Sequence, residues 1–229
     1  MTADNSIWAH DAHADEQREH RINLALLRGV LENLRGHRKS VPLFALAVGV
    51  MFSQWVSPIW IAAWYAQVML CVVIQLLVIN TFPAGELTRA EARRSTWIAS
   101  AANLFFVANW TSLGWYMWVP GNPFNHMLIA IVLAATLAAH STVAGASRQM
   151  AVPAFIVYGV AMTLVPLQDH DAQAVYIAMV SPFYVGYIAH IAKQHHRRAR
   201  AAIVLVEERN SLLAELVMAK IESDRGRER

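Results

Sequence analysis

Long apolar stretches separated by short polar ones fill most of the chain, between Ser40 and Ala192. A helix that crosses a bilayer needs about 17–25 mostly apolar residues. Six stretches meet this requirement: residues 40–57, 59–82, 96–119, 126–145, 149–167 and 172–192. The pattern predicts an all-α fold in which six transmembrane helices form a polytopic bundle.

An amphipathic segment, residues 16–39, precedes the first apolar stretch. Its leucines at positions 24, 27, 31 and 34 recur at helical spacing, with Arg and Glu between them. Two interpretations fit this pattern. The helix lies along the inner surface of the membrane, or it is a dimerisation helix that packs on the other end of the chain.

The last apolar stretch runs on into a charged helical segment. No Gly or Pro occurs between Tyr187 and Arg225, so one continuous helix is expected to extend into the cytoplasm. Beyond the basic run, an apolar seam repeats in heptads through Ile203, Val206, Asn210, Leu213 and Val217. An Asn at such a position fixes the register of a parallel pair. The seam predicts a parallel coiled coil and a homodimer; the alternative is a solvated amphipathic helix.

The chain is thus expected to have three parts: a cytoplasmic segment, 1–39; a six-span domain, 40–192; and a cytoplasmic signalling helix, 193–229. A rigid pair of helices that extends from a membrane domain is suited to transmitting a conformational change to a domain that follows it. We call such a pair an output rod. We therefore expect an output domain to have followed it in a longer protein.

Composition and charge support the membrane assignment. Hydrophobic residues make up 56% of the sequence and charged residues only 15%. Lys and Arg lie before the first span, between spans two and three, between spans four and five, and after span six, whereas the other loops have none. The positive-inside rule then places both termini in the cytoplasm. These basic clusters suit anionic lipid headgroups and not nucleic acid.

Polar and aromatic side chains within the spans are the candidate binding residues for a small amphiphilic ligand, because polar groups at membrane depth are costly without partners. The candidates come from spans three, four and six: Asn103, Asn109, Trp110, Trp115, His126, Ser181, Tyr184 and Tyr187. Gln75 and His140 also fall inside spans. The alternative role for each is an ordinary hydrogen bond between helices.

Signal transmission is expected to run along the sixth span. Pro182 interrupts its backbone hydrogen bonds and Gly186 follows, so a kink and a hinge are expected there. Within the tail, Asn210, Leu213 and Val217 are the candidate transmission residues, since an offset seam through Leu212, Leu216 and Ala219 permits a change of register.

The sequence contains no recognisable catalytic motif, so no enzymatic activity is assigned to this chain. We expect no cofactor and no metal. The His residues near the N-terminus lack a ligand spacing, and the single cysteine, Cys71, lies in an apolar run.

The C-terminal stretch EERNSLLAELVMAKIESDRGRER, residues 207–229, resembles the signalling helix of alphaproteobacterial membrane sensor histidine kinases. The six-span arrangement is similar to the sensor domains of quorum-sensing kinases that detect α-hydroxyketones. The resemblance implies a sensory and dimerisation module of a two-component kinase that detects a small amphiphilic or membrane-borne signal. The phosphoacceptor and ATP-binding motifs are absent, so this chain is not expected to phosphorylate anything itself.

Two other functions remain open. The same rod would serve the membrane anchor of a diguanylate or adenylate cyclase. A small transporter or channel is the third class. The lack of Asp, Glu, Lys and Arg inside the six stretches argues against it, because no proton or ion relay is evident.

Overall fold

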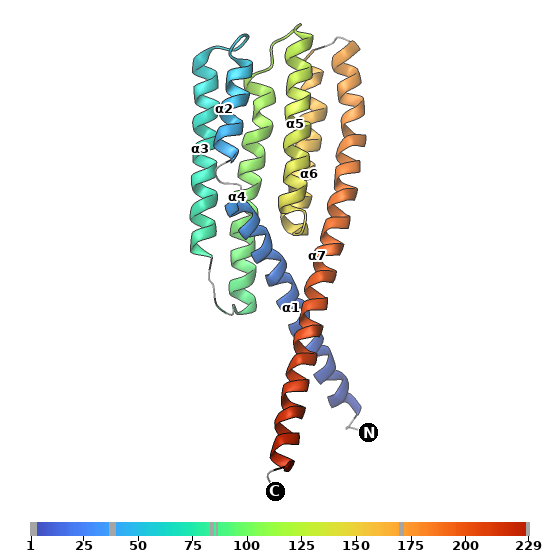
Figure 1. Ribbon diagram of the computed structural model, residues 1–229. Coiled ribbons are helices and arrows are strands. Elements are labelled where there is room, and N and C mark those ends of the chain that lie inside the picture. The colour runs from blue at the N-terminus through green and yellow to red at the C-terminus, as the bar shows by residue number, and fades with distance from the viewer. Residues whose placement is uncertain (1–3, 37–39, 83–84, 86, 170–171, 228–229) are drawn as a thin grey trace.

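The structure is a computed structural model that describes residues 4–36, 40–82, 85, 87–169 and 172–227, with side chains from residue 16 onwards apart from residues 223, 224, 226 and 227. Every element within these ranges is a helix, which confirms the all-α prediction. The elements are α1 Asp4–Gly36, α2 Ser40–Phe52, α3 Pro58–Thr81, α4 Arg89–Tyr116, α5 Pro123–Ala144, α6 Arg148–Leu164, the short 3-10 helix η2 Pro166–Gln168, and α7 Ala172–Arg227. Helices α2 to α7 form an upright bundle, and α1 and the tail of α7 leave it at the same end and cross (Figure 1).

Helix α4 packs at the centre of the bundle, chiefly between α3 and α6. Its buried side chains include the polar Asn103, Asn109 and Thr111 as well as Val107 and Leu113. A helix with this many polar groups is stable in apolar surroundings only where other helices enclose it. The central position of α4 therefore follows from its sequence.

Four helices are long and apolar enough to cross a membrane: α3, α5, α6 together with η2, and α7 over Ala172–Glu222. Helix α4 has the length, with 28 residues, but is too polar to meet the same criterion. Helix α2 is apolar but has only 13 residues. At 1.5 Å per residue it extends about 20 Å, less than the roughly 30 Å of a hydrocarbon core.

The predicted first span, residues 40–57, therefore extends beyond the end of the helix that the structure contains. Helix α2 stops at Phe52, and residues 53–57 form turns. In those turns the Ser53 hydroxyl donates to the Val50 carbonyl at 2.7 Å, and the backbone N–H of Trp55 donates to the Phe52 carbonyl at 3.0 Å. The backbone N–H groups of Ser53 and Trp55 thus bond three residues back and not four, which ends the α-helical pattern, and hydropathy does not register such a change.

Local capping sets where the next helices begin. Ser57 and Asn122 each accept a backbone N–H in the first turn of α3 and α5, and a proline follows each cap at the first helical position. Thr88 and Glu91 form a reciprocal capping box at the start of α4. The hydrogen bonds from Thr88 lower the pKa of the Glu91 carboxyl, so Glu91 is ionised beside the positive end of the helix dipole.

Helix α1 packs on the bundle through its apolar face. Its buried residues, at most 5% exposed, are Ile22, Leu26, Leu27, Val30 and Leu31. Part of this face joins the ends of α3 and α5 and the starts of α4 and α6 in a second apolar core that includes Ile79, Ala99, Ala144 and Met150. Protein therefore covers much of the apolar face of α1, and its placement along the membrane surface stays a prediction. Packing on the other end of the chain does occur, between α1 and α7 of a single chain.

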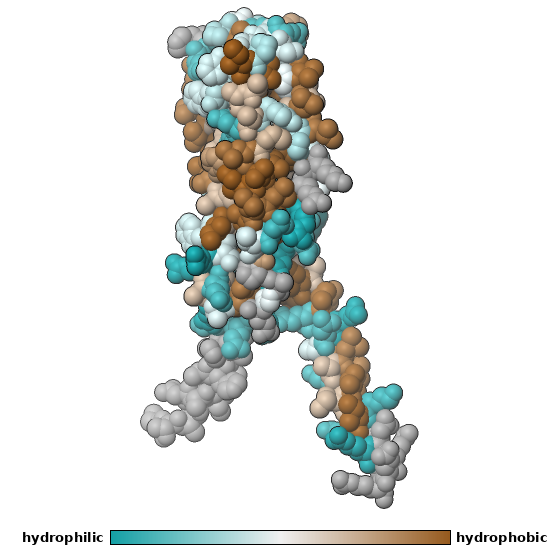
Figure 2. Space-filling view, turned by 90° about the vertical axis from the view of Figure 1, so that its left-hand side faces the viewer, coloured by the Kyte–Doolittle hydropathy of each residue, from teal (hydrophilic) through white to brown (hydrophobic). Residues whose placement is uncertain are grey.

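Helix α7 is continuous for 56 residues and passes through Pro182 without ending. Its tail presents a row of exposed apolar side chains, visible as a brown stripe in Figure 2: Leu205, Val206, Leu212, Leu213, Leu216, Val217, Met218 and Ile221. Asn210 is exposed beside them. A single continuous helix is confirmed, and an unpartnered stripe of this kind is what a coiled-coil seam requires of one chain. The pairing itself stays a prediction.

We expect Gly114→Val to destabilise the bundle by about 1–3 kcal/mol, since overpacking forces neighbouring groups to move. A Cβ atom at Gly114 would lie 2.9 Å from Cγ1 of Val165, so α4 approaches the end of α6 too closely for any side chain. Thermal unfolding in detergent measures the effect. Gly186→Val is the matched control, because a Cβ atom there meets nothing within 4 Å. Equal loss of stability in both variants would contradict the close packing of α4.

Candidate functional site

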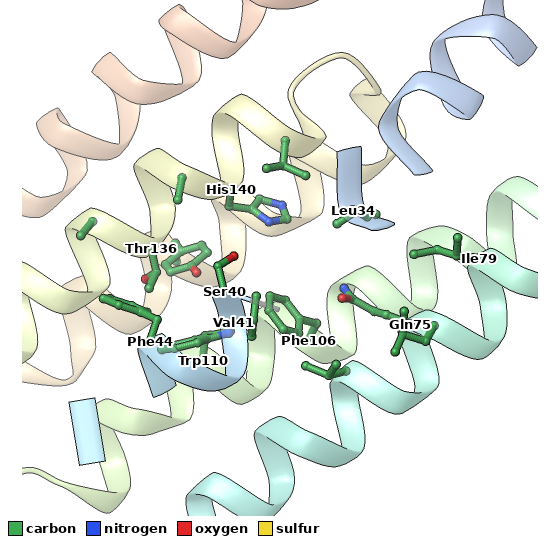
Figure 3. Close-up of a pocket in the computed structure, with 16 residues that line it drawn as sticks. Leu34, Ser40, Val41, Phe44, Gln75, Ile79, Phe106, Trp110, Thr136 and His140 are labelled. Atoms are coloured by element: carbon green, nitrogen blue, oxygen red, sulfur yellow. The ribbon is translucent and has the colours of Figure 1, made fainter. Parts of the chain in front are cut away.

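A cavity of about 440 Å³ lies where the end of α1 and the start of α2 meet α3, α4, α5 and α6, and it is open on one side, where the lining residues Ser40, Phe44 and Ala139 are exposed. Its volume falls within the range of small-molecule sites, about 300–1,000 Å³. Figure 3 shows Leu34 of α1, Gln75 of α3, Phe106 and Trp110 of α4, and His140 of α5 around it. The lining residues are Leu34, Ser40, Val41, Phe44, Val72, Gln75, Leu76, Ile79, Phe106, Trp110, Ala135, Thr136, Ala139, His140, Val143 and Tyr158.

Aromatic rings hold one wall of the cavity in place. The ring of Trp110 lies 5.6 Å from that of Phe44, 6.2 Å from that of Phe106 and 5.3 Å from that of Trp64, measured between centroids. Trp64 is in turn anchored, because its indole N–H donates to the Asn109 carbonyl at 3.4 Å. Tilted and edge-on contacts of this kind are favourable, so the wall is rigid before any ligand arrives.

Polar groups stand at the opposite wall. His140 Nε2 lies 3.5 Å from Asn103 Nδ2, and the same Asn103 amide donates to the Met150 carbonyl at 3.4 Å. Tyr158 of α6 and Thr136 of α5 line the cavity beside His140. The contacts of Asn103 position the imidazole at the cavity surface.

Some hydrogen-bonding capacity near the cavity is unused. Gln75 Nε2, which belongs to a lining residue, is buried without a hydrogen-bond partner, and so is Asn103 Oδ1 behind His140. Each orphaned group costs free energy that a ligand could recover. Among the described residues, which leave out residues 37–39 between Leu34 and Ser40, no Asp, Glu, Lys or Arg lines the cavity. The described lining therefore suits a mostly apolar molecule with one or two hydrogen-bonding groups.

The predicted binding residues do not share one cavity. Trp110 lines the cavity, and Asn103 supports it through His140. Asn109 lies behind the aromatic wall and has an unpartnered Nδ2. The Tyr184 hydroxyl instead donates to the Ala134 carbonyl of α5 at 2.9 Å, as ordinary helix–helix bonding.

Trp115 and Tyr187 lie on the outside of the bundle, 54% and 63% exposed. Neither residue belongs to the lining of the cavity beside Trp110, and no described residue of α7 does. A binding role for Trp115 and Tyr187 stays a prediction.

His126 and Ser181 lie together at the opposite end of the bundle from α1. His126 is fully buried, stacks on Trp118 at 3.9 Å, and places Nε2 3.0 Å from Asp169 Oδ2 and 2.9 Å from the Val119 carbonyl. The backbone N–H of Gly121, whose φ is 72°, also donates to Asp169 at 3.1 Å. These contacts tie the α4–α5 turn to the segment before α7. The space beside them is about 10 Å³, which is room for no more than a water molecule, so the cluster closes this end of the bundle. A binding role for His126 and Ser181 stays a prediction.

Sequence reasoning missed several lining residues: Phe44, Phe106, Thr136 and Tyr158. Gln75 and His140 were detectable as polar groups at membrane depth. Phe44 and Tyr158 gave no such signal, because an aromatic residue in an apolar span packs equally well against lipid or protein.

Among the residues whose side chains are described, no three His, Cys, Asp or Glu gather in a group that could hold a metal ion. Comparison of the chain with protein families, characterised proteins and solved structures finds no match. Fold and site together define a class only: a helical protein, compatible with a membrane, with an uncharged cavity inside its bundle.

We expect Ala139→Trp to fill the cavity and weaken the binding of an uncharged amphiphilic probe, such as a medium-chain hydroxyketone, at least tenfold. Ala139 lines the cavity, and an indole there would occupy much of its volume. Isothermal titration calorimetry in detergent measures the affinity. The control is Ala63→Trp, at an exposed α3 position outside the lining. An unchanged affinity in Ala139→Trp would exclude this cavity as the binding site.

Proposed function

We propose that this chain is the membrane sensor and dimerisation region of a bacterial two-component sensor histidine kinase, and that it detects a small, uncharged amphiphilic molecule. One observation carries the proposal: α1 contributes a wall of the cavity at its C-terminal end and is ion-paired to α7 nearer its N-terminal end. A single element thus touches both the candidate ligand site and the candidate output helix.

Six crossings of the inner membrane, with both termini in the cytoplasm, agree best with the distribution of Lys and Arg. Enclosure by its neighbours allows α4 to cross despite its polar residues. Helix α2 alone is too short to cross. In this proposal the first crossing is made by α2 together with the turns at residues 53–57, where Val56 is buried and Trp55 is half-buried against the bundle.

The ligand would enter from the bilayer, because the bundle offers an apolar surface there and none of the described lining residues is charged. Its polar group would reach His140, Gln75 or Ser40, and its apolar part would pack on Phe44, Phe106 and Trp110. Contact of the ligand with Leu34 of α1 and Ser40 of α2 would then favour one position of α1 relative to α2 over another.

Ion pairs carry the contact between α1 and α7. Arg21 Nη2 lies 2.9 Å from Glu207 Oε1, Arg18 lies 3.6 Å from Glu207 and 3.3 Å from Glu208, and Glu19 pairs with Arg200. Exposed pairs contribute only about 0–1 kcal/mol each. Such a contact is weak enough for a ligand to break or restore it, provided that the ligand binds more tightly when α1 is in one position than when it is in another.

The output would be the arrangement of a parallel pair of α7 tails. The ion pairs reach Glu207 and Glu208, which lie between Val206 and Asn210 of the apolar seam. Movement of α1 would therefore act at the base of the seam and change how two tails pack. The resemblance of residues 207–229 to kinase signalling helices is the reason to choose a histidine kinase as the output.

The coding sequence beyond the Arg229 codon tests the function directly. A motif with a phosphoacceptor His would support the proposal. A cyclase domain in that position, or a stop codon, would refute the kinase assignment.

A disulfide-crosslinking experiment tests the tail pairing. In a Cys71→Ala background, Leu213→Cys should give a covalent dimer in oxidised membrane vesicles, because a seam residue faces its own copy across the two-fold axis. Glu215→Cys, which lies off the seam, serves as the control. Crosslinking of Glu215→Cys without Leu213→Cys would rule out this seam.

Charge reversal tests the contact between α1 and α7. We expect Glu207→Arg to lengthen and broaden the distance between spin labels at positions 23 and 211, since Arg18 and Arg21 would then repel α7. Adding Arg18→Glu and Arg21→Glu should restore the short distance. Electron–electron double resonance measures it, and an unchanged distribution in Glu207→Arg would show that these pairs do not hold α1.

A further inference from the structure

A second, larger cavity of about 960 Å³ opens at the end of the bundle from which α1 and the α7 tail emerge. It is here called the basic crevice. Helices α1, α4, α6 and α7 and the α5–α6 turn all contribute to its walls. It shares none of its lining residues with the cavity around Trp110.

The crevice carries more positive than negative charge. Its lining contains Arg89, Arg93, Arg148 and Arg200 but only one carboxylate, Glu19. Arg200 pairs with that Glu19, and Arg89 pairs with Glu16 at 2.9 Å. Arg93 and Arg148 are exposed and make no ion pair with any described residue. Two uncompensated guanidinium groups from different helices thus stand at one opening, which is a favourable arrangement for a phosphate.

Neutral hydrogen-bond donors lie in the same lining. Helix α6 starts here, and the side chain of its N-cap residue, Ser147, makes no capping hydrogen bond. The hydroxyl of Ser100, on α4, is buried without a hydrogen-bond partner and belongs to the same crevice. The first-turn N–H groups of α6 add the positive end of its dipole. These donors complement the two arginines in binding an anion.

One side of the crevice is apolar. Trp97 and Leu104 lie two turns apart on α4, and Val152 lies on α6. Trp97 is 68% exposed and Val152 is 51% exposed. A soluble phosphate would leave this surface uncovered, whereas a phosphate that carries acyl chains would cover it. Basic pockets between helices at the cytoplasmic side of a membrane are typical sites for anionic lipid headgroups.

We infer that the basic crevice binds an anionic phospholipid of the inner leaflet. Its phosphate lies between Arg93 and Arg148, with Ser147 as a hydrogen-bond donor, and an acyl chain follows Trp97, Leu104 and Val152. The inference rests on the proposed membrane location. Because α1 and α7 also wall the crevice, the bound lipid links the bundle to the ion-paired region, and the content of anionic lipid sets the resting position of α1.

The test uses the whole chain, delipidated in a neutral detergent, with short-chain phosphatidylglycerol and phosphatidylcholine as probes. Native mass spectrometry or calorimetry measures the affinity. We expect phosphatidylglycerol to bind at least tenfold more tightly than phosphatidylcholine. The double variant Arg93→Gln/Arg148→Gln should weaken phosphatidylglycerol binding at least tenfold, because each basic residue contributes substantially to the affinity for an anionic lipid.

The matched control removes two exposed arginines outside the crevice, in the variant Arg94→Gln/Arg198→Gln. It should change the affinity less than threefold. An equal loss in the control would overturn the site in favour of general surface charge. Equal affinity of the unaltered chain for phosphatidylglycerol and phosphatidylcholine would also overturn the proposed lipid site. If glycerol phosphate competes for the crevice as strongly as phosphatidylglycerol does, the ligand is a soluble anion and the lipid assignment is refuted.

These results are separate from those that test the sensor proposal. Lipid binding by the detergent-solubilised chain requires neither a dimer nor a ligand in the cavity around Trp110. A failed crosslink at Leu213 would therefore not contradict the inference about lipid binding. A chain that purifies as a monodisperse protein without detergent would refute the membrane location and with it both proposals.

Discussion

Burial of the polar face of α4 is the constraint on which the rest of the structure depends. Asn103, Asn109 and Thr111 cannot face an apolar medium at acceptable cost, so α4 must be enclosed by other helices. Enclosure places α3 and α6 directly against it. The absence of a side chain at Gly114 lets the end of α6 approach closely at one end of the helix. The cavity around Trp110, here called the inner cavity, lies nearer α1, with Trp110 and Phe106 of α4 in its wall.

The inner cavity and α1 form one mechanical unit. Leu34, near the end of α1, and Ser40, the first residue of α2, border the cavity, while Arg18 and Arg21 of α1 bind carboxylates of α7. The buried face between them, which includes Leu27 and Val30, makes α1 a packed element of the bundle. Strong packing near the cavity and weak pairing near the tail suit a lever whose distal contact can be released.

The two cavities have opposite chemistry, and position accounts for the difference. The inner cavity lies among helices that are apolar over most of their length, and none of its described lining residues is charged. The basic crevice lies where helices end, so that exposed arginines and unpaired helix-terminal groups are available. An uncharged amphiphile and an anionic lipid would therefore occupy separate sites, and α1 contributes to the walls of both. Coupling between them would follow from that shared helix and needs no direct contact between the two ligands.

Local sequence features determined the elements of this protein. Caps at Ser57, Thr88 and Asn122 set where helices start, the length of the apolar stretches set most of the helices, and the lack of Gly and Pro after Tyr187 made the tail continuous. Only the tertiary structure decided which faces those helices bury. It packed α1 against the bundle, separated Trp115 and Tyr187 from Trp110, and brought Thr136, His140 and Tyr158 to a cavity. The physical reason is that lipid and protein interior are equally apolar, so hydropathy and helical periodicity cannot distinguish a side chain that faces lipid from one that faces another helix.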